Sequence, residues 1–300
     1  MYTNEDYKSD KELIKNLLSK TYFVPIDKDF GIEKYLIAKY PVTQKLWQEV
    51  TGEDTAFCHF NGNNLLPVEN VSWNKCQDFI ATLNYLLKRV RLIELLSEVQ
   101  SKKSLETLRL ELLKTLQLSE VQSKESLETL QLELLKTLKL SEDQLSKDPL
   151  NKLLSEVKTG KFRLPTEKEW EYAAKGAYHS KVFGSNNKFT YAGSNNIDEV
   201  AWYKGNSNGR THPVGNLAAT NVNGNNELKL YDMSGNVWEW CNYDSDKEAL
   251  GEIKVLRGGA WDCDEEYCLV TFRYVNHHTS HQISPQIDPN SIGFRLVYIP

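Results

Sequence analysis

Two cysteines towards the C-terminal end of the chain carry the clearest chemical signal. Cys263 and Cys268 are separated by four residues, and neighbouring thiolates bind soft ions such as Cu(I). The following stretch contains His277, His278 and His281, and neutral imidazoles suit zinc or copper. No helix is expected here to place His277 and His281 on one face. A transition-metal site is therefore one interpretation, and a contact surface is the other.

Aromatic residues favour the contact surface. Tyr267, Phe272 and Tyr274 accompany the cysteines and histidines, and this composition is typical of adaptable binding surfaces. The sequence contains no Ser-His-Asp order, no paired-carboxylate signature and no GxGxxG pattern in a strand-to-helix setting. Hydrolase and nucleotide-binding functions are therefore not supported.

Arginines in apolar sequence contexts are expected to pair with carboxylates, since a guanidinium leaves water only when its charge is matched. These arginines are Arg163, Arg257 and Arg295, and the candidate partners are Glu69, Glu169, Glu171 and Glu239. Several tryptophans are expected to supply apolar area and one N–H donor each: Trp73, Trp170, Trp238, Trp240 and Trp261. The pattern predicts a core of short elements tied by side-chain hydrogen bonds.

Short elements with clear end signals must position these residues. A strand is expected at 35–41, and Thr43 then caps a helix over 44–50 that Gly52 ends. The stretch 185–226 is rich in Asn and Gly, which favour local turns, so it is expected to form loops.

Two further helices are expected on either side of the middle of the chain. The spacing of apolar residues over 79–90 predicts an amphipathic helix. Thr166 and Glu169 form a capping-box pattern for a helix over 167–175, which Gly176 ends.

An internal repeat separates these two helices. Residues 96–117 and 118–139 differ at only three of 22 positions, and a third copy begins at Leu140. Leucines spaced by three and four predict helix, and a period of twice 11 residues would continue as one helix with a right-handed supercoil. Capping-box patterns at Ser97 and Ser119 equally allow several short helices. Both arrangements remain open.

The repeat block is predicted to be a helical insertion at 93–158 within a single domain formed by 1–92 and 159–300. Its charges are expected to form a solvated face, and Asp148 with Pro149 predicts the start of a last short helix.

The overall composition is that of an ordinary globular protein. With 40% hydrophobic and 26% charged residues, collagen-like, wholly disordered and disulfide-dense classes are excluded. The 36 basic and 41 acidic side chains give a net charge of -5, so neither nucleic acid nor an anionic membrane is expected as a partner. Five dispersed cysteines are expected to be reduced. No signal peptide or long apolar run is present, which predicts a cytoplasmic protein without membrane insertion.

Several long motifs resemble one known family. They are, in order, residues 40–44 (YPVTQ), 67–73 (PVENVSW), 162–174 (FRLPTEKEWEYAA), 231–240 (YDMSGNVWEW), 256–261 (LRGGAW) and 292–297 (IGFRLV). In this order they closely resemble the formylglycine-generating enzyme, or sulfatase-modifying-factor, family. The resemblance implies an α+β, C-type-lectin-like fold with short strands, long loops and a helical insertion.

The resemblance also implies two possible metals. Family members bind calcium through a loop that corresponds to 235–239, and Asn236 and Glu239 match that motif. Catalytic members oxidise a substrate cysteine with copper held by a Cys-x4-Cys pair, which matches Cys263 and Cys268.

The copper-binding pattern is incomplete in this chain. Ala260 stands where catalytic relatives have Ser, and Asp264 stands where they have His. The run after Cys268 also differs from theirs. The alternative is that Cys268 is a core cysteine and Cys263 an incidental surface thiol.

Within the family, the chain is most similar to the variable proteins of diversity-generating retroelements. These proteins display a hypervariable ligand-binding face between their RGGxW and IGFR motifs, which corresponds to 262–292. Diversified AAY codons cannot encode Lys, Glu, Gln, Met or Trp, and only four of these 31 positions hold such residues. The resemblance implies a protein or other macromolecular ligand and no cofactor. The implied contact residues are Asp262, Cys263, Asp264, Tyr267, Leu269, Phe272, Tyr274, Asn276, His277, His278, Ser280 and His281.

Overall fold

A computed structural model gives the structure of most of the chain outside the repeats. It describes residues 4–19, 21–27, 32–100, 159–176, 189–216, 226, 228–243, 254–276 and 287–300. The predicted repeat helices beyond Gln100 and the short helix after Pro149 lie outside these residues. No helix in the described part is long and apolar enough to cross a membrane.

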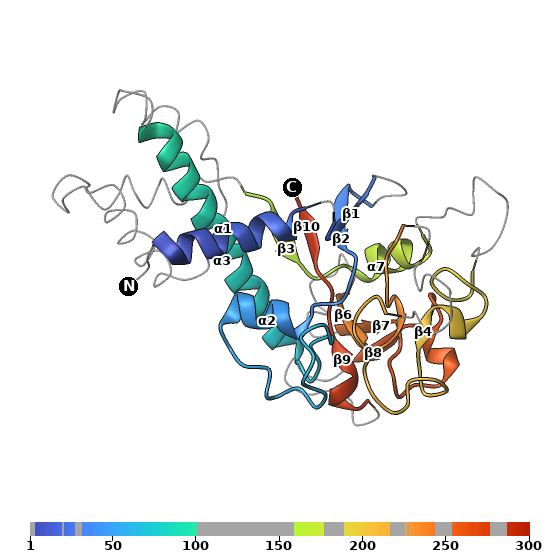
Figure 1. The fold of residues 1–300 in the computed structure, drawn as a ribbon. Coiled ribbons are helices and arrows are strands. Elements are labelled where there is room, and N and C mark those ends of the chain that lie inside the picture. The colour runs from blue at the N-terminus through green and yellow to red at the C-terminus, as the bar shows by residue number, and fades with distance from the viewer. Residues whose placement is uncertain are drawn as a thin grey trace. The chain divides into compact units, whose positions relative to one another are not determined.

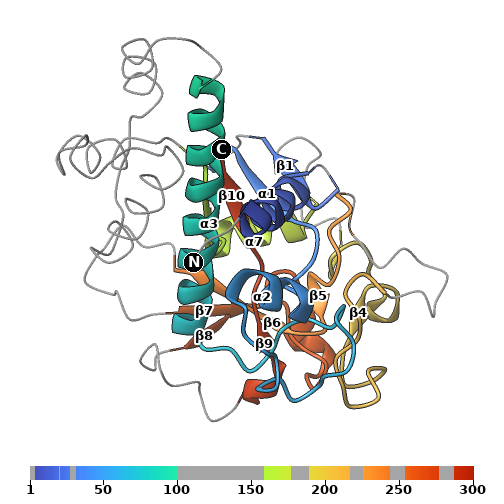
Figure 2. The same ribbon diagram turned by 60° about the vertical axis from the view of Figure 1, so that its left-hand side comes forward.

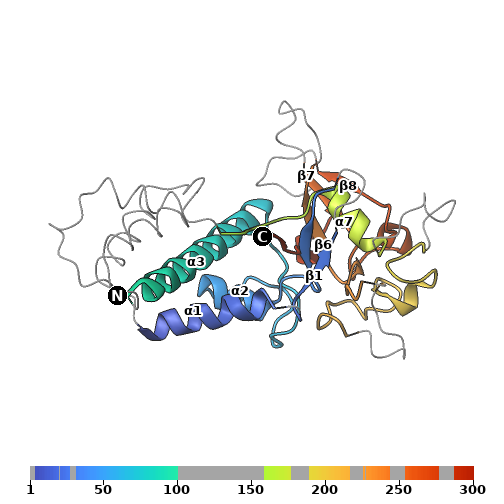
Figure 3. The ribbon, with the colours of Figure 1, turned by 90° about the horizontal axis from the view of Figure 1, so that it is seen from above.

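The described residues form two compact units. The first contains most of α1 (Asn4–Leu17) and the second half of α3 (Trp73–Gln100), and the second contains the other elements. Within the first unit α1 lies alongside α3 (Figure 3). Asp10 pairs with Arg89, and the Lys11 ammonium lies 3.0 Å from a Glu94 carboxylate oxygen.

The predicted helix over 79–90 is confirmed as part of α3. This helix continues through Ser97 into the first repeat, so the capping-box pattern at Ser97 does not break it. The sequence analysis did not predict the N-terminal helix α1.

The second unit is built on two four-stranded sheets (Figure 1). The first sheet has the order β1-β2-β10-β3, with these bounds: β1 Phe23–Ile26, β2 Tyr35–Ala38, β10 Val297–Ile299 and β3 Lys161–Arg163. Its central register places Ile37 opposite Val24 on one side and opposite Val297 on the other. The chain's last strand therefore lies beside one of its first.

The second sheet has the order β8-β7-β6-β9 (Figure 2). Its strands are β8 Tyr274–Asn276, β7 Lys254–Arg257, β6 Trp238–Asn242 and β9 Ile292–Gly293. Strand β9 pairs in parallel with β6, and β7 and β8 are antiparallel. A separate parallel pair joins β4 (Ala201–Trp202) to β5 (Ser234–Gly235).

Two short helices of the second unit form where their sequence signals predict, although α7 ends one residue earlier than expected. Thr43 caps α2 (Gln44–Thr51) by accepting from the Leu46 N–H at 3.1 Å, and Gly52 ends it at φ 70°. Helix α7 (Glu167–Ala174) begins with the predicted capping box between Thr166 and Glu169. It contacts β6 and β7. The 185–226 stretch is largely loop where it is described, with one 3-10 turn, η2 (Ile197–Glu199), before β4.

All three predicted arginine pairs form. Arg163 binds Glu169, Arg257 binds Glu171, and Arg295 binds Glu239 with both side chains fully buried. Arg295 also donates to the carbonyl oxygens of Ala38 and Tyr231, so it links β2 to the loop before β5. The Arg257–Glu171 and Arg295–Glu239 pairs join segments that are far apart in the sequence, whereas Arg163 and Glu169 are near neighbours in the chain.

The predicted tryptophan core is also present. Trp170, Trp238 and Trp240 are fully buried. The Trp170 indole donates to Glu239 at 2.6 Å, and the Trp240 indole donates to the Val71 carbonyl at 2.9 Å. Trp73 differs, because its indole N–H has no partner among the described residues and its ring lies under the Lys254 ammonium at 3.8 Å.

Candidate functional site

The start of the predicted contact segment is held close to β7 by two glycines. Gly258 and Gly259 have φ values of 95° and 72°, a region that other residues rarely adopt. A Cβ atom on Gly259 would lie 2.7 Å from the Cys268 sulfur and 2.9 Å from the Tyr267 carbonyl oxygen. The 3-10 turn η5 (Glu265–Cys268) can therefore pack against β7 only because position 259 has no side chain.

Hydrogen bonds to main-chain atoms hold residues 261–270 in place. The Ser207 hydroxyl donates to the Trp261 carbonyl at 2.7 Å, and the Ser234 hydroxyl donates to the Cys268 carbonyl at 2.8 Å. The Val270 N–H donates to a carbonyl of the preceding loop at 3.1 Å. Because these bonds use the backbone of the segment, they place few demands on its side chains.

Aromatic side chains from the segment gather around Trp238. The ring of Phe272 lies 6.0 Å from the Trp238 ring, and those of Tyr267 and Tyr274 lie at 6.4 and 6.3 Å. Tyr267 and Phe272 also contact each other edge-to-face at 5.0 Å. Trp238 is buried, whereas the other three rings are partly exposed. We call these four residues the aromatic cluster.

The other predicted contact residues have different environments. Asp262, Cys263 and Leu269 are partly buried. Asp264 is exposed, and its carboxylate lies 3.0 Å from the Lys204 ammonium. Asn276 is the last residue of β8 and pairs with Lys254 in register. His277, His278, Ser280 and His281 lie outside the described residues, so the predictions for these four residues remain predictions.

The two cysteines of the predicted copper pair are poorly suited to form thiolates. Burial, together with the nearby Asp262 charge, raises the pKa of Cys268 to about 12. Burial and Asp262 also raise the pKa of Cys263, whose thiol lies 3.6 Å from an Asp262 carboxylate oxygen. Cys268 is fully buried. The raised pKa values of both thiols disfavour the deprotonated form that copper binds.

The two predicted calcium ligands are already engaged with protein groups. Glu239 accepts hydrogen bonds from Arg295 and Trp170, with its carboxylate 2.8 Å from the guanidinium. The Asn236 side chain bonds to both backbone groups of His212, each at 3.0 Å. In this arrangement the two residues do not fit a calcium ion, and the calcium site stays a prediction. Within the described residues, no group of three or more His, Cys, Asp or Glu side chains is arranged to hold a metal.

Comparison with known proteins places this geometry in a family. Residues 12–299 match the sulfatase-modifying factor enzyme 1-like domain. The chain belongs to this family. A relative from Paenibacillus barcinonensis, named chaperone protein LppX, is 30% identical over 78% of this chain and 72% of its own length. The formylglycine-generating enzyme of Streptomyces coelicolor is 31% identical, but over only 44% of this chain and 45% of that protein.

A solved structure supports the family's α+β, C-type-lectin-like fold over nearly the whole chain. Treponema denticola variable protein 1 is similar with a TM-score of 0.52 and 28% identity, and the match covers 93% of this chain and 92% of that one. The predicted likeness to variable proteins of this family is therefore confirmed.

Two buried carboxyls in the family's motifs differ from the sequence prediction, which did not name Asp232 and gave Glu69 a different kind of partner. Asp232 is buried beside Asn236 and accepts from the Gly215 N–H at 2.6 Å, and burial raises its pKa to about 6. Glu69 was expected to pair with an arginine. Instead, one of its oxygens accepts from the Phe60 N–H at 2.8 Å, and the other has no partner among the described residues. Asp232 gives no distinct sequence signal, because its partners Gly215 and Asn236 come together only in the fold.

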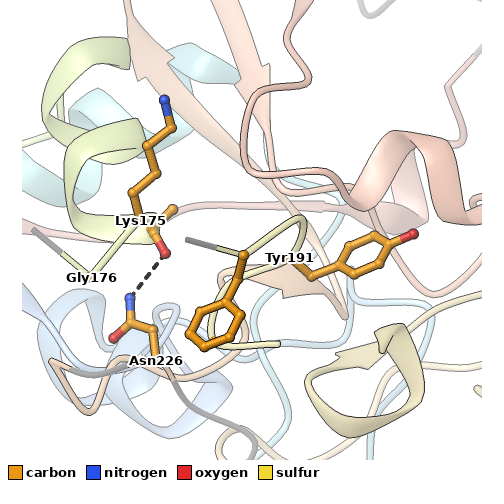
Figure 4. Close-up of a pocket in the computed structure, with 7 residues that line it drawn as sticks. Lys175, Gly176, Tyr191 and Asn226 are labelled. Carbon is orange, nitrogen blue, oxygen red and sulfur yellow. Dashed lines mark hydrogen bonds between the residues drawn. The ribbon is translucent and has the colours of Figure 1, made fainter. Parts of the chain in front are cut away.

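A small recess lies at the end of α7, and its lining includes Asn226, Lys175, Gly176 and Tyr191 (Figure 4). The Asn226 side chain donates to the carbonyl oxygens of Ala173 and Ala174 at 2.6 and 3.2 Å and accepts from two backbone N–H groups. The amide is fully engaged in ending the helix. This recess therefore has a structural role.

Proposed function

We propose that the chain is a ligand-binding module that contacts a protein through residues 262–292. The observation that carries this proposal is the aromatic cluster. Tyr267, Phe272 and Tyr274 remain partly exposed around a buried tryptophan, on a segment whose main chain is fixed by surrounding residues. Rigid, partly exposed aromatic rings give large contact area at a low entropy cost.

The residues beside the cluster suit a protein ligand. Asp264, Glu265 and Glu266 are exposed next to the aromatic rings, so apolar contact area is bordered by polar groups. Protein interfaces commonly combine an aromatic centre with a polar rim. The similarity to a variable protein over nearly its whole length supports the same use of this segment.

The second candidate function is copper-dependent oxidation of a substrate cysteine through Cys263 and Cys268. The spacing of the two cysteines and the match to formylglycine-generating enzymes favour it. The raised thiol pKa values and the enclosed position of Cys268 oppose it.

Cysteine variants separate the two functions. We expect Cys263→Ser to change the free energy of unfolding by less than about 0.5 kcal/mol, and Cys268→Ser to lower it by about 1 to 3 kcal/mol, as for a buried core residue. Neither thiol should bind Cu(I) tightly. Copper-dependent oxidation of a cysteine-containing peptide by the wild-type protein, lost in either variant, would instead establish the oxidase.

A further inference from the structure

The turn that carries Phe272 is held by a cation outside the contact segment. Arg257 lies on β7 with a side chain that is 1% exposed. One guanidinium nitrogen donates to the Thr271 carbonyl at 3.2 Å and to the Phe272 carbonyl at 2.6 Å. The second terminal nitrogen of the guanidinium lies 3.5 Å from the Val270 carbonyl oxygen. Three consecutive carbonyl groups thus converge on one side chain.

Helix α7 holds this guanidinium in place. Glu171 forms an ion pair with Arg257, and the guanidinium lies 5.3 Å from the ring centre of Trp170, the preceding residue of the helix. One turn earlier, Glu167 binds Arg273 at 3.1 Å. Glu171 of α7 therefore contacts the turn through Arg257, and Glu167 of α7 pairs with Arg273 next to the turn.

We propose that Glu171 and Arg257 are positioning residues that set the shape of the contact surface. Arg257 draws the 270–272 carbonyl groups inward, and this orientation leaves the Phe272 ring against Tyr267 and Trp238. Glu171 keeps the guanidinium aimed at the turn. This inference rests on the proposed function of the segment, since the two residues touch no ligand themselves.

The chemistry of arginine explains why this position needs a guanidinium. Its planar fork presents several N–H groups in fixed directions, which suits three carbonyl oxygens and one carboxylate at once. A lysine ammonium keeps the charge but concentrates its donors on one atom. Arg257→Lys should therefore retain the ion pair while releasing part of the turn.

Amide hydrogen exchange tests this proposal without any ligand. The Val270 N–H is bonded to the Thr190 carbonyl at 3.1 Å and the Phe272 N–H to the Leu269 carbonyl at 3.0 Å, so both amides report on the turn. In Arg257→Lys we expect both to exchange roughly tenfold faster, as for the loss of one charged hydrogen bond. Glu171→Gln should produce a smaller increase at the same two amides.

Arg163→Lys is the matched control. Arg163 of β3 pairs with Glu169 of α7 and also donates to the Leu164 carbonyl at 3.0 Å, away from the turn. The Arg163→Lys substitution should leave the hydrogen-exchange rates of the Val270 and Phe272 amides unchanged. The Trp47 N–H, bonded within α2 at 2.9 Å, serves as the reference for global opening.

Two results would overturn the proposal. One is unchanged exchange at Val270 and Phe272 in Arg257→Lys, and the other is an equal acceleration at Trp47, which would indicate only a general loss of stability. If Arg257→Lys does not fold, Glu171→Gln decides by the same criteria. Because hydrogen exchange is measured without a ligand, a failure of this proposal is distinguishable from a failure of the proposed binding function.

Discussion

Buried charges in this chain are matched to very different degrees. Arg295 and Glu239 form hydrogen bonds with each other, and Arg295 also donates to a backbone carbonyl. Both buried charges therefore have hydrogen-bond partners. Glu69 is also buried, yet only one of its oxygens has a partner among the described residues. Burial therefore raises the pKa of Glu69 to about 7, and the Asp288 charge adds to the shift.

The raised pKa of Glu69 predicts that the free energy of unfolding depends on pH. The folded value of about 7 lies above the ordinary 4.5, so the folded state binds the proton more tightly. The resulting stabilisation is complete below the unfolded pKa and is lost as pH rises through about 7. Glu69→Gln remains neutral and keeps an oxygen for the Phe60 N–H. We expect it to gain stability relative to wild type between about pH 5 and about pH 8.

Urea unfolding of both proteins across this range measures the difference. Glu53→Gln, which changes an exposed carboxyl, is the control and should show no such trend. A difference between Glu69→Gln and wild type that stays constant with pH would contradict the account.

At the scale of elements, the contact segment is fastened by features outside it. Gly259 permits the close approach of η5, and Ser234 and Arg257 bind carbonyl oxygens of the segment. Ser207 binds the carbonyl of Trp261, just before the segment. These bonds hold the segment through its main-chain atoms and leave its side chains uninvolved. Such an arrangement favours sequence change on the surface without loss of the fold.

A pair of glycine substitutions tests this close approach. Gly259→Ala places a Cβ atom 2.7 Å from the Cys268 sulfur at φ 72° and should cost about 3 kcal/mol or more of unfolding free energy. Gly52→Ala shares a positive φ of 70° but has no atom within 4 Å, so it should cost only about 1 kcal/mol. Equal losses in thermal or urea unfolding would show that the contact with η5 does not matter.

How far the sequence predicts these elements depends on the range of the interactions. Helices α2 and α7 were predictable because Thr43 and the Thr166–Glu169 pair act within one turn. Arg257 was expected to find a carboxylate, but its partner lies 86 residues away in sequence. Its bonds to the 270–272 carbonyl groups carry no sequence signal, because any residue supplies a carbonyl oxygen. Side-chain patterns therefore could not reveal the positioning role.

In the molecule as a whole, the prediction that a repeat block at 93–158 interrupts the family domain stays a prediction, because the two compact units divide the chain at other residues. The motifs before residue 93 and after residue 158 belong to one fold, since β2 and β10 pair across the interruption. An insertion that leaves such pairing intact must return near its point of departure.

Removal of the insertion should therefore leave the family domain folded. We expect a protein with residues 93–158 replaced by a Gly/Ser linker to unfold cooperatively and to retain its near-ultraviolet circular dichroism. The same linker placed between β6 and β7, replacing 244–253, offers a control of equal chemistry. Loss of the near-ultraviolet signal on removal of 93–158 would show that the domain depends on the insertion.

If a fixed main chain presents variable side chains for binding, a display library of the contact residues should yield binders. The varied positions would be Asp262, Asp264, Tyr267, Leu269, Phe272 and Tyr274. A control library would vary the same number of exposed positions elsewhere: Lys45, Glu49, Glu53, Asp54, Asn61 and Asn64. Both libraries would be selected against one purified target protein, with affinities measured by biolayer interferometry. The account predicts folded binders with Kd of about 1 μM or tighter from the first library, well beyond any from the second. Folded clones from the first library that bind no better than the control would contradict it.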